Sequence, residues 1–176
     1  MLEYKLLDLN EVSPALIRDY YDEFTDSGEE CSVLWKLNYL DPFEFAKECK
    51  KDRRTLYLCF FLPSGRLGGI ARITPNPNHI ENGRMGYALR PTERGKGYAP
   101  IMLNLIQVYC EHQGIDNVTA CVDRRNLASR NALEKAGWIE TGNVYAWTQK
   151  RLALEYVPKI FRDYSYKPTT ADLSAE

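Results

Sequence analysis

Features that mark secreted, membrane-spanning or zinc-binding proteins are missing from this sequence. The cysteines are odd in number and no two stand at C-x-x-C spacing, which argues against a disulfide framework and a zinc site. No segment approaches about 18 uninterrupted apolar residues, so no transmembrane helix is expected. The first residues lack a basic start followed by an apolar stretch, so no signal peptide is expected. These absences predict a soluble protein of the reducing cytoplasm that does not bind membranes.

An excess of charge of one sign is also missing. The 23 Lys and Arg residues nearly balance the 24 Asp and Glu residues, giving a net charge of −1. A dedicated nucleic-acid binder usually carries a strong positive excess, so no nucleic-acid partner is expected. The 11 glycines and 9 prolines are too few for a low-complexity chain. With 176 residues and no internal repeat, we expect one domain over residues 1–167, followed by a polar tail over 168–176.

Helices and strands are both expected, from the spacing of apolar residues and from cap and turn signals. Helix starts are indicated by Ser13-Pro14, by Asp41-Pro42 and by Asn126. The second of these helices should end near residue 51, and another helix should run from about residue 98 to about 112. The expected strands cover residues 2–9, 55–62, 67–74, 84–90, 117–122, 138–140 and 151–157. The Asn-Pro and Asn-Gly pairs within residues 75–83 predict a loop there.

The glycine-rich stretch Arg94-Gly95-Lys96-Gly97-Tyr98-Ala99 lies between an expected strand and an expected helix. The first backbone N–H groups of a helix have no partner within it, and the helix dipole adds partial positive charge. Glycines let this backbone approach a bulky anion, and the arginine and lysine add charge. The stretch therefore predicts a phosphate or pyrophosphate site. The alternative is a plain strand-to-helix turn with a solvated arginine and lysine.

Two familiar nucleotide motifs do not fit this stretch. A Walker loop needs Ser or Thr after its Gly-Lys pair, but Gly97 follows Lys96. A dinucleotide fingerprint needs a third glycine where Pro100 stands. The stretch therefore matches neither motif.

The stretch resembles the Q/R-x-x-G-x-G/A signature of the GCN5-related N-acetyltransferase (GNAT) superfamily. Further on, Asn126-Leu-Ala-Ser129, followed by Glu134-Lys-Ala-Gly-Trp138, resembles the family's second motif, N-x-x-S/A…E-K-x-G-F. The resemblance implies an α/β (α+β) fold with a mixed, mostly antiparallel central sheet of about seven strands, flanked by about four helices. At Ser129 the chain resembles the branch of ribosomal-protein-type N-acetyltransferases, which carries a serine three residues after the Asn.

The resemblance also implies an acetyl-CoA site. The backbone of Gly95–Ala99, including Tyr98, would bind the coenzyme A pyrophosphate, with Arg94 and Lys96 beside it. The strand end at Leu89 would bind the pantetheine arm and polarise the acetyl carbonyl. Asn126 would contact the pantetheine from the start of the second helix. A plain helix N-cap is an equally physical role for Asn126.

The catalytic groups are less clearly marked. Many members of the family carry a tyrosine, proposed to protonate the departing thiolate, where this chain has Leu133. The resemblance to the ribosomal-protein-type branch implies that a serine three residues after the Asn could take that role, and Ser129 stands at this position. The alternative is a hydroxyl that closes the helix N-terminus. No general base can be assigned. Glu81, Glu93 and Asp123 flank the expected site, and each is also explained as a solvated loop carboxylate.

Other chemically interesting residues carry alternative explanations. Tyr87 and Tyr145 could contact substrate or pack in the core. His79 and His112 have no partner pattern for a triad or a metal site. An acidic and aromatic cluster could attract a cationic amine or could be a solvated helix face. It contains Asp19, Tyr20, Tyr21, Asp22, Glu23, Phe24, Asp26, Glu29 and Glu30.

Two functions follow from the motifs. The first is an N-acetyltransferase that uses acetyl-CoA as co-substrate, without a metal, and acetylates a primary amine by direct attack in a ternary complex. The acceptor could be a peptide or a small molecule. The second is a CoA-binding sensor or partner module with little catalysis. A homodimer is possible for either, because dimers are common in the family.

Overall fold

The computed structural model describes residues 3–31, 33–34, 37, 40–52, 54–76, 79–115, 117–148 and 151–158. Seven strands form a sheet in the order β1-β2-β3-β4-β5-β7-β6, and four α-helices accompany it in this part of the chain. The strands are β1 (Lys5–Asp8), β2 (Leu56–Phe61), β3 (Leu67–Asn76), β4 (His79–Leu89), β5 (Asn117–Asp123), β6 (Trp138–Thr148) and β7 (Arg151–Pro158). The helices are α1 (Pro14–Asp26), α2 (Pro42–Lys51), α3 (Tyr98–His112) and α4 (Leu127–Lys135).

The sheet is mixed and mostly antiparallel, which confirms the expected fold class. The pairs β1–β2, β2–β3, β5–β7 and β6–β7 are antiparallel, and β4 pairs with β5 in parallel. The chain divides into two compact units. The first comprises residues 1–74 and 86–106, and the second comprises 75–85 and 107–176.

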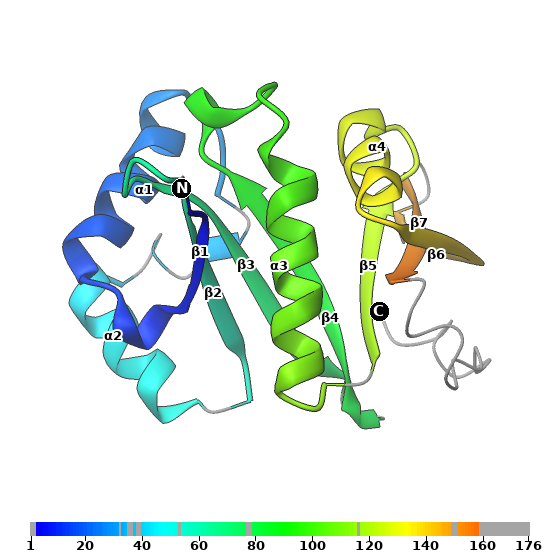
Figure 1. Ribbon diagram of the computed structural model, residues 1–176, viewed down its shortest axis with the longest axis horizontal. Coiled ribbons are helices and arrows are strands. Elements are labelled where there is room, and N and C mark those ends of the chain that lie inside the picture. The colour runs from blue at the N-terminus through cyan, green and yellow to red at the C-terminus, as the bar shows by residue number, and fades with distance from the viewer. Residues whose placement is uncertain are drawn as a thin grey trace. The chain divides into compact units, whose positions relative to one another are not determined.

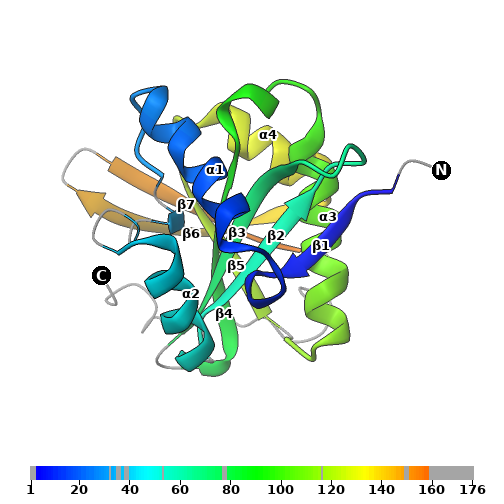
Figure 2. The same ribbon diagram turned by 90° about the vertical axis from the view of Figure 1, so that its left-hand side faces the viewer.

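In the first unit, α1 and α2 cover one face of strands β1 to β3, and α3 lies on the other face (Figures 1 and 2). Strand β2 is buried on both faces. Tyr57 and Cys59 belong to the core formed with α1 and α2, while the alternate residues Leu58 and Phe60 are also fully buried. Burial on both faces explains why this strand reads as an unbroken run of β-formers.

In the second unit, β5, β6 and β7 form an antiparallel group beside the early part of β4, and α4 packs with them. Leu133 of α4 is fully buried, and the Arg130 side chain donates from Nε to the Tyr156 hydroxyl of β7 at 3.0 Å. Gly137 ends α4 with φ 83°, a left-handed conformation that suits glycine.

Two of the predicted helix caps differ in their chemistry. The Asp41 carboxylate accepts the N–H groups of Phe43 and Glu44 at 2.8 and 3.0 Å, which confirms the predicted start of α2. Ser13 directly precedes α1, as predicted, but its side chain makes no cap hydrogen bond. The proline at the first position of α1 accounts for this helix start, because its φ is already helical.

The predicted loop over residues 75–83 is wrong. Strand β3 extends to Asn76 and β4 begins at His79, so His79 lies in a strand. Asn82 and Gly83 pair in parallel with Asn117 and Val118 of β5. This long-range pairing overrides the local turn preference of the Asn-Gly sequence. The predicted tail over 168–176 lies outside the described residues.

Candidate functional site

The glycine turn ahead of α3 has the backbone geometry that the sequence predicts. Gly95 and Gly97 adopt φ values of 72° and 80°, and a Cβ on either would meet no atom within 4 Å. The turn therefore presents bare backbone beside open space. Helix α3 begins at Tyr98. Pro100 lies in its first turn, where the missing N–H costs no helical hydrogen bond. This backbone fits a bulky anion such as a pyrophosphate.

Both cations of the turn are already paired with carboxylates. Arg94 Nη1 lies 2.7 Å from Glu29 Oε2, and the guanidinium lies 5.5 Å from the centre of the Phe24 ring. Lys96 Nζ lies 3.0 Å from Glu93 Oε2. Both side chains remain exposed, as the alternative of a solvated arginine and lysine expects, and an anion at the turn would share or replace these carboxylate partners.

The end of β4, which enters the turn, is held from helix α1. The Tyr20 hydroxyl donates to the Ala88 carbonyl oxygen at 2.6 Å. One residue beyond the strand, the Arg90 N–H donates to the Gly68 carbonyl of β3 at 2.8 Å. Leu89, the residue predicted to contact acetyl-CoA, lies between these two anchors and is 9% exposed. The backbone around Leu89 is therefore fixed on both sides.

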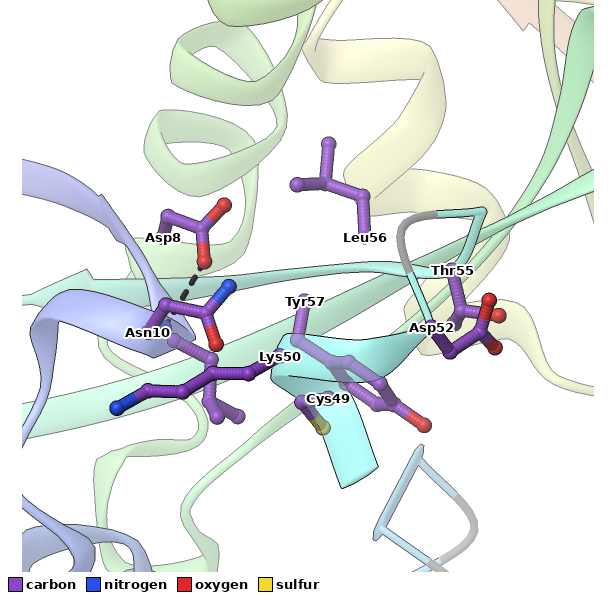
Figure 3. Close-up of a pocket in the computed structure, with 9 residues that line it drawn as sticks. Asp8, Asn10, Cys49, Lys50, Asp52, Thr55, Leu56 and Tyr57 are labelled. Atoms are coloured by element: carbon purple, nitrogen blue, oxygen red, sulfur yellow. Dashed lines mark hydrogen bonds between the residues drawn. The ribbon is translucent and has the colours of Figure 1, made fainter. Parts of the chain in front are cut away.

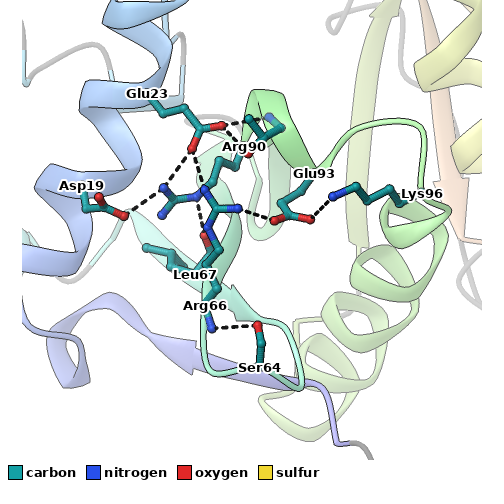
Figure 4. A network of polar contacts seen from close by, with 9 residues as sticks. Asp19, Glu23, Ser64, Arg66, Leu67, Arg90, Glu93 and Lys96 are labelled. Carbon is teal, nitrogen blue, oxygen red and sulfur yellow. Dashed lines mark hydrogen bonds and ion pairs between the residues drawn. The ribbon is translucent and has the colours of Figure 1, made fainter.

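Arg90 is the centre of a buried polar network (Figure 4). Its side chain is only 2% exposed, and Nε donates to the Leu67 carbonyl at 2.8 Å. Nη1 donates to Asp19 Oδ2 at 2.8 Å and to Glu23 Oε2 at 3.0 Å. The guanidinium also lies 5.7 Å from the centre of the Tyr20 ring. A buried guanidinium is tolerated only when its donors find partners of this kind.

Glu23 connects this network to the segment that follows β4. Its Oε1 accepts the Thr92 N–H at 2.8 Å and the Thr92 hydroxyl at 2.7 Å. Burial alone would raise the pKa of Glu23, but the hydrogen bonds from Thr92 and from Arg90 outweigh it, and the pKa is lowered. Glu23 is therefore a carboxylate throughout the neutral range.

Glu93 extends the network to the glycine turn. Its carboxylate accepts from Arg66 Nη1 and from Lys96 Nζ, and its side chain is 7% exposed. Figure 4 shows Glu93 between these two cations. The interpretation of Glu93 as a solvated loop carboxylate is therefore wrong.

In the second unit, α4 starts as predicted at Asn126. Its side-chain Oδ1 accepts the Ser129 N–H at 3.2 Å, so the cap role of Asn126 is confirmed. Asn126 is exposed and Ser129 is half-buried. Asp123, at the end of β5, accepts from the backbone N–H and the guanidinium of Arg125. Leu133 is fully buried, so the position of the family tyrosine is part of the core here.

Tyr145 belongs to a second buried network, in the sheet of the second unit. Its hydroxyl donates to Glu155 Oε2 at 2.6 Å, and the Arg84 guanidinium lies 5.3 Å from the centre of its ring. Glu155 also accepts from Thr141 Oγ1 and Asn143 Nδ2, and it is 3% exposed. The core role weighed for Tyr145 is confirmed, since the ring is 2% exposed. Tyr87 is half-buried.

A pocket of about 380 Å³ lies elsewhere in the first unit (Figure 3). Its walls come from β1, α2, β2 and the segments that join them. Its carboxylates serve the local backbone, because Asp8 accepts the Asn10 N–H and Asp52 accepts the Arg54 N–H. None of the residues predicted for acetyl-CoA lines it. The lining residues are Asp8, Leu9, Asn10, Cys49, Lys50, Asp52, Thr55, Leu56 and Tyr57.

The described residues contain no group of three or more His, Cys, Asp or Glu side chains placed to hold a metal ion. None of the five cysteines forms a disulfide. Among the helices of the described part of the chain, none is both long and apolar enough to cross a membrane.

The mixed seven-stranded sheet and the glycine turn ahead of α3 agree with the class of protein that the sequence motifs resemble, an acyltransferase. The sequence matches the acetyltransferase (GNAT) domain over residues 14–139. The chain therefore belongs to the GNAT family of N-acetyltransferases. No curated protein sequence matches it.

Solved structures agree with this fold. A chimeric spermidine N-acetyltransferase from Vibrio cholerae superposes with a TM-score of 0.67 at 15% identity, covering 88% of this chain and 94% of its own. The ribosomal-protein-S5-alanine acetyltransferase from Vibrio fischeri has a TM-score of 0.66 at 14% identity and covers 94% of this chain and 96% of its own. A dodecameric spermidine N-acetyltransferase from V. cholerae has a TM-score of 0.65 at 14% identity, covering 88% and 92%.

Sequence reasoning identified the glycine turn and the cap of α4 but missed the network around Arg90. A signal was present, because Asp19, Tyr20 and Glu23 are spaced so that a single helix face presents two carboxylates beside buried aromatics. Such a helix face indicates a buried cation on the element that packs against it. The sequence offered no means of choosing Arg90 among the 23 lysines and arginines.

Proposed function

We propose that this protein transfers the acetyl group of acetyl-CoA to a primary amine by direct attack in a ternary complex. The observation that carries the proposal is the turn at Gly95 and Gly97, whose left-handed glycines present open backbone ahead of α3 in a chain of the GNAT family. Bound acetyl-CoA would supply an activated thioester. We propose a single acetyltransferase domain over residues 1–167.

The proposed binding residues are those of the two motifs that resemble the family. The backbone N–H groups of Gly95–Ala99, with Arg94 and Lys96, would hold the pyrophosphate. The Leu89 N–H would donate to the thioester carbonyl as negative charge develops on its oxygen. Asn126 would contact the pantetheine while its Oδ1 caps α4.

The chemical step requires an amine that has lost its proton, because an ordinary lysine-type amine has a pKa near ~10.4. The neutral nitrogen attacks the thioester carbonyl carbon, the C–S bond breaks, and the CoA thiolate leaves. We propose that the Ser129 hydroxyl gives the thiolate a proton and recovers one from the nitrogen, which loses its extra proton as the amide forms. The family tyrosine proposed for this role is absent, because its position is Leu133 in this chain. A thiolate is already a fair leaving group, so a weak acid is sufficient. The general base is not assigned.

Two measurements test the proposal. Thermal unfolding with and without millimolar acetyl-CoA or CoA should show a clear stabilisation, because a ligand that binds only the folded state raises its apparent stability. The absence of any shift would reject the acetyl-CoA site. Thiol release from acetyl-CoA should then be followed over a panel of amines that includes spermidine, a peptide with an N-terminal alanine, free amino acids and an aminoglycoside.

The panel also separates the enzyme from a CoA-binding sensor or partner module. Thiol release above the hydrolysis background for any amine supports the enzyme. Binding of CoA without turnover of any amine in the panel would favour the sensor.

We further propose that the protein works in the cytoplasm as a homodimer. Five cysteines without disulfides suit a reducing cytoplasm, and a fraction of the chain carrying disulfides after isolation under native conditions would argue against it. A homodimer is proposed, and light scattering coupled to size-exclusion chromatography would distinguish it from a monomer or a larger assembly. No metal is proposed for the reaction.

A further inference from the structure

The peptide group that joins Ala88 to Leu89 has its two polar ends on opposite sides of strand β4. Arg90 donates its N–H to Gly68 of β3 at 2.8 Å. Successive N–H groups along a strand point to opposite edges, so the Leu89 N–H points away from β3. In a planar trans peptide the carbonyl oxygen points opposite to the N–H, so the Ala88 oxygen points back toward β3.

That carbonyl oxygen accepts a hydrogen bond from helix α1. The Tyr20 hydroxyl donates to it at 2.6 Å, across 68 positions of the sequence. The bond acts on the same rigid group that carries the Leu89 N–H, so it fixes the direction of this N–H as well. Drawing electron density toward the oxygen also makes the amide N–H a stronger donor, as in any chain of hydrogen bonds.

Packing fixes the position of the Tyr20 hydroxyl, and burial keeps it protonated as a hydrogen-bond donor. The side chain is completely buried, with the Arg90 guanidinium 5.7 Å from its ring centre and the Phe24 ring tilted at 5.1 Å. Burial raises the pKa of Tyr20 well above its ordinary value, so the hydroxyl keeps its proton wherever the protein is folded. Arg90 is held in turn by Asp19 and Glu23.

We propose that Tyr20 is a positioning residue for acetyl transfer. Its hydroxyl orients and polarises the Ala88–Leu89 peptide, so that the Leu89 N–H meets the thioester carbonyl as an aligned and strengthened donor. This inference rests on the proposed function, because it needs acetyl-CoA to bind at the end of β4. It adds a residue of α1 that touches neither the co-substrate nor the amine.

The direct readout is the carbonyl stretching frequency of bound acetyl-CoA, isotope-labelled at the thioester carbonyl and followed by infrared difference spectroscopy. In the natural protein this frequency should fall below that of free acetyl-CoA, because a hydrogen bond weakens the C=O bond. In Tyr20→Phe it should return toward the free value. The kcat with an amine found active in the panel should fall roughly 10-fold, less than the loss of a whole oxyanion donor. The Kd of CoA, which lacks the carbonyl, should stay within about twofold of the natural value.

A substitution that shifts the carbonyl frequency in the opposite direction separates polarisation of the peptide from simple packing of the ring. Fluorotyrosine incorporated at Tyr20 keeps the shape of the ring but makes the hydroxyl a stronger donor. It should lower the carbonyl frequency further, whereas a purely structural role predicts no such shift. Tyr57→Phe is the matched control, since Tyr57 is a second buried tyrosine of the same unit that lines the pocket of Figure 3. Its loss should leave the frequency unchanged.

The outcomes separate the inference from the function on which it rests. If the natural protein does not bind acetyl-CoA, the proposed function fails. If it binds and transfers acetyl but its carbonyl frequency is that of free acetyl-CoA, or is the same in folded Tyr20→Phe, the inference is wrong. If Tyr20→Phe does not fold, the fluorotyrosine protein decides, and an unchanged frequency in it overturns the inference.

Discussion

The end of β4 and the start of α4 both carry proposed acetyl-CoA contacts, yet the two places are built by opposite means. The segment from Ala88 to Lys96 is anchored by buried charges and by a tyrosine from a helix far away in sequence. The start of α4 depends on one local hydrogen bond from the exposed cap residue Asn126. The first place needs the whole unit to be folded, and the second needs only four neighbouring residues.

This difference indicates what each place is for. Replacing buried ion pairs with apolar residues often leaves stability unchanged or improves it, so the network at Arg90 is poorly explained as a source of stability. Orientation of the β4 end explains it better. A cap bond such as that of Asn126 stabilises a helix modestly and can be supplied by several residue types. The four predictions below test this contrast, from the largest expected effect to the smallest.

The largest effect is expected from Arg90→Met. This change removes the donor to the buried Leu67 carbonyl and one of the donors to the Glu23 carboxylate, and breaking a buried pair in this way costs about 3 kcal/mol or more. Urea unfolding measures the loss. The control is Arg18→Met, which breaks an exposed ion pair with Asp22 within α1. It should lower the free energy of unfolding by less than about 0.5 kcal/mol. Equal losses would show that the network contributes nothing special.

The next effect concerns binding. In Gly97→Glu the new carboxylate enters the open space at the turn and repels the pyrophosphate, so the affinity for CoA should fall roughly 100-fold, about 2.7 kcal/mol. Isothermal titration calorimetry gives the Kd. Gly114→Glu is matched for backbone strain, since Gly114 has φ 70° and the same open surroundings. It should lose similar stability and keep its CoA affinity. An unchanged Kd in folded Gly97→Glu would move the proposed site elsewhere.

A smaller effect is expected at the start of α4 from Ser129→Ala. The change removes the hydroxyl but keeps the N–H that donates to Asn126, so α4 should be retained. If the hydroxyl protonates the thiolate, kcat should fall roughly 10-fold while the Kd of CoA is unchanged, since a thiolate leaves without much assistance. Ser129→Thr should recover most of the rate. A natural kcat in Ser129→Ala would leave the hydroxyl with a purely structural role.

The smallest effect distinguishes the two roles of Asn126. Asn126→Ala removes the cap and should cost about 1 kcal/mol of stability. Asn126→Asp keeps a capping oxygen and places a carboxylate at the positive end of the helix, so its thermal stability should match the natural protein. As a carboxylate it cannot donate an N–H to the pantetheine, so the KM for acetyl-CoA should rise several-fold. Natural kinetics in Asn126→Asp would reduce Asn126 to a cap.

Local rules predicted much of the fold because the signals were local. The bounds of α2 follow from Asp41-Pro42, and those of α3 follow from the glycine turn and the apolar run after it. The wrong loop over residues 75–83 shows where local rules stop. Asn82 and Gly83 lie in a strand because β5 supplies their partners, and that pairing cannot be read from the segment alone.

The candidate site divides in the same way. Its backbone was predictable, since positive φ at Gly95 and Gly97 and the cap at Asn126 depend on short sequence patterns. Its side-chain partners were not. The pairing of Arg94 with Glu29 joins residues 65 positions apart, and Tyr20 reaches Ala88 across 68. Contacts at such separations follow from the packing of α1 against the sheet.

The charge balance of the first unit has a kinetic consequence. Four cations and four carboxylates lie around the end of β4 and the glycine turn. Three of each sign are joined in one network of ion pairs, and the remaining cation and carboxylate form a separate pair. They are Arg66, Arg90, Arg94 and Lys96 with Asp19, Glu23, Glu29 and Glu93. Opposite charges this close cancel beyond roughly a Debye length, so little attractive field reaches a distant polyanion. For the proposed CoA site, encounter should therefore proceed by ordinary diffusion rather than electrostatic steering, and the association rate of CoA should vary little with ionic strength.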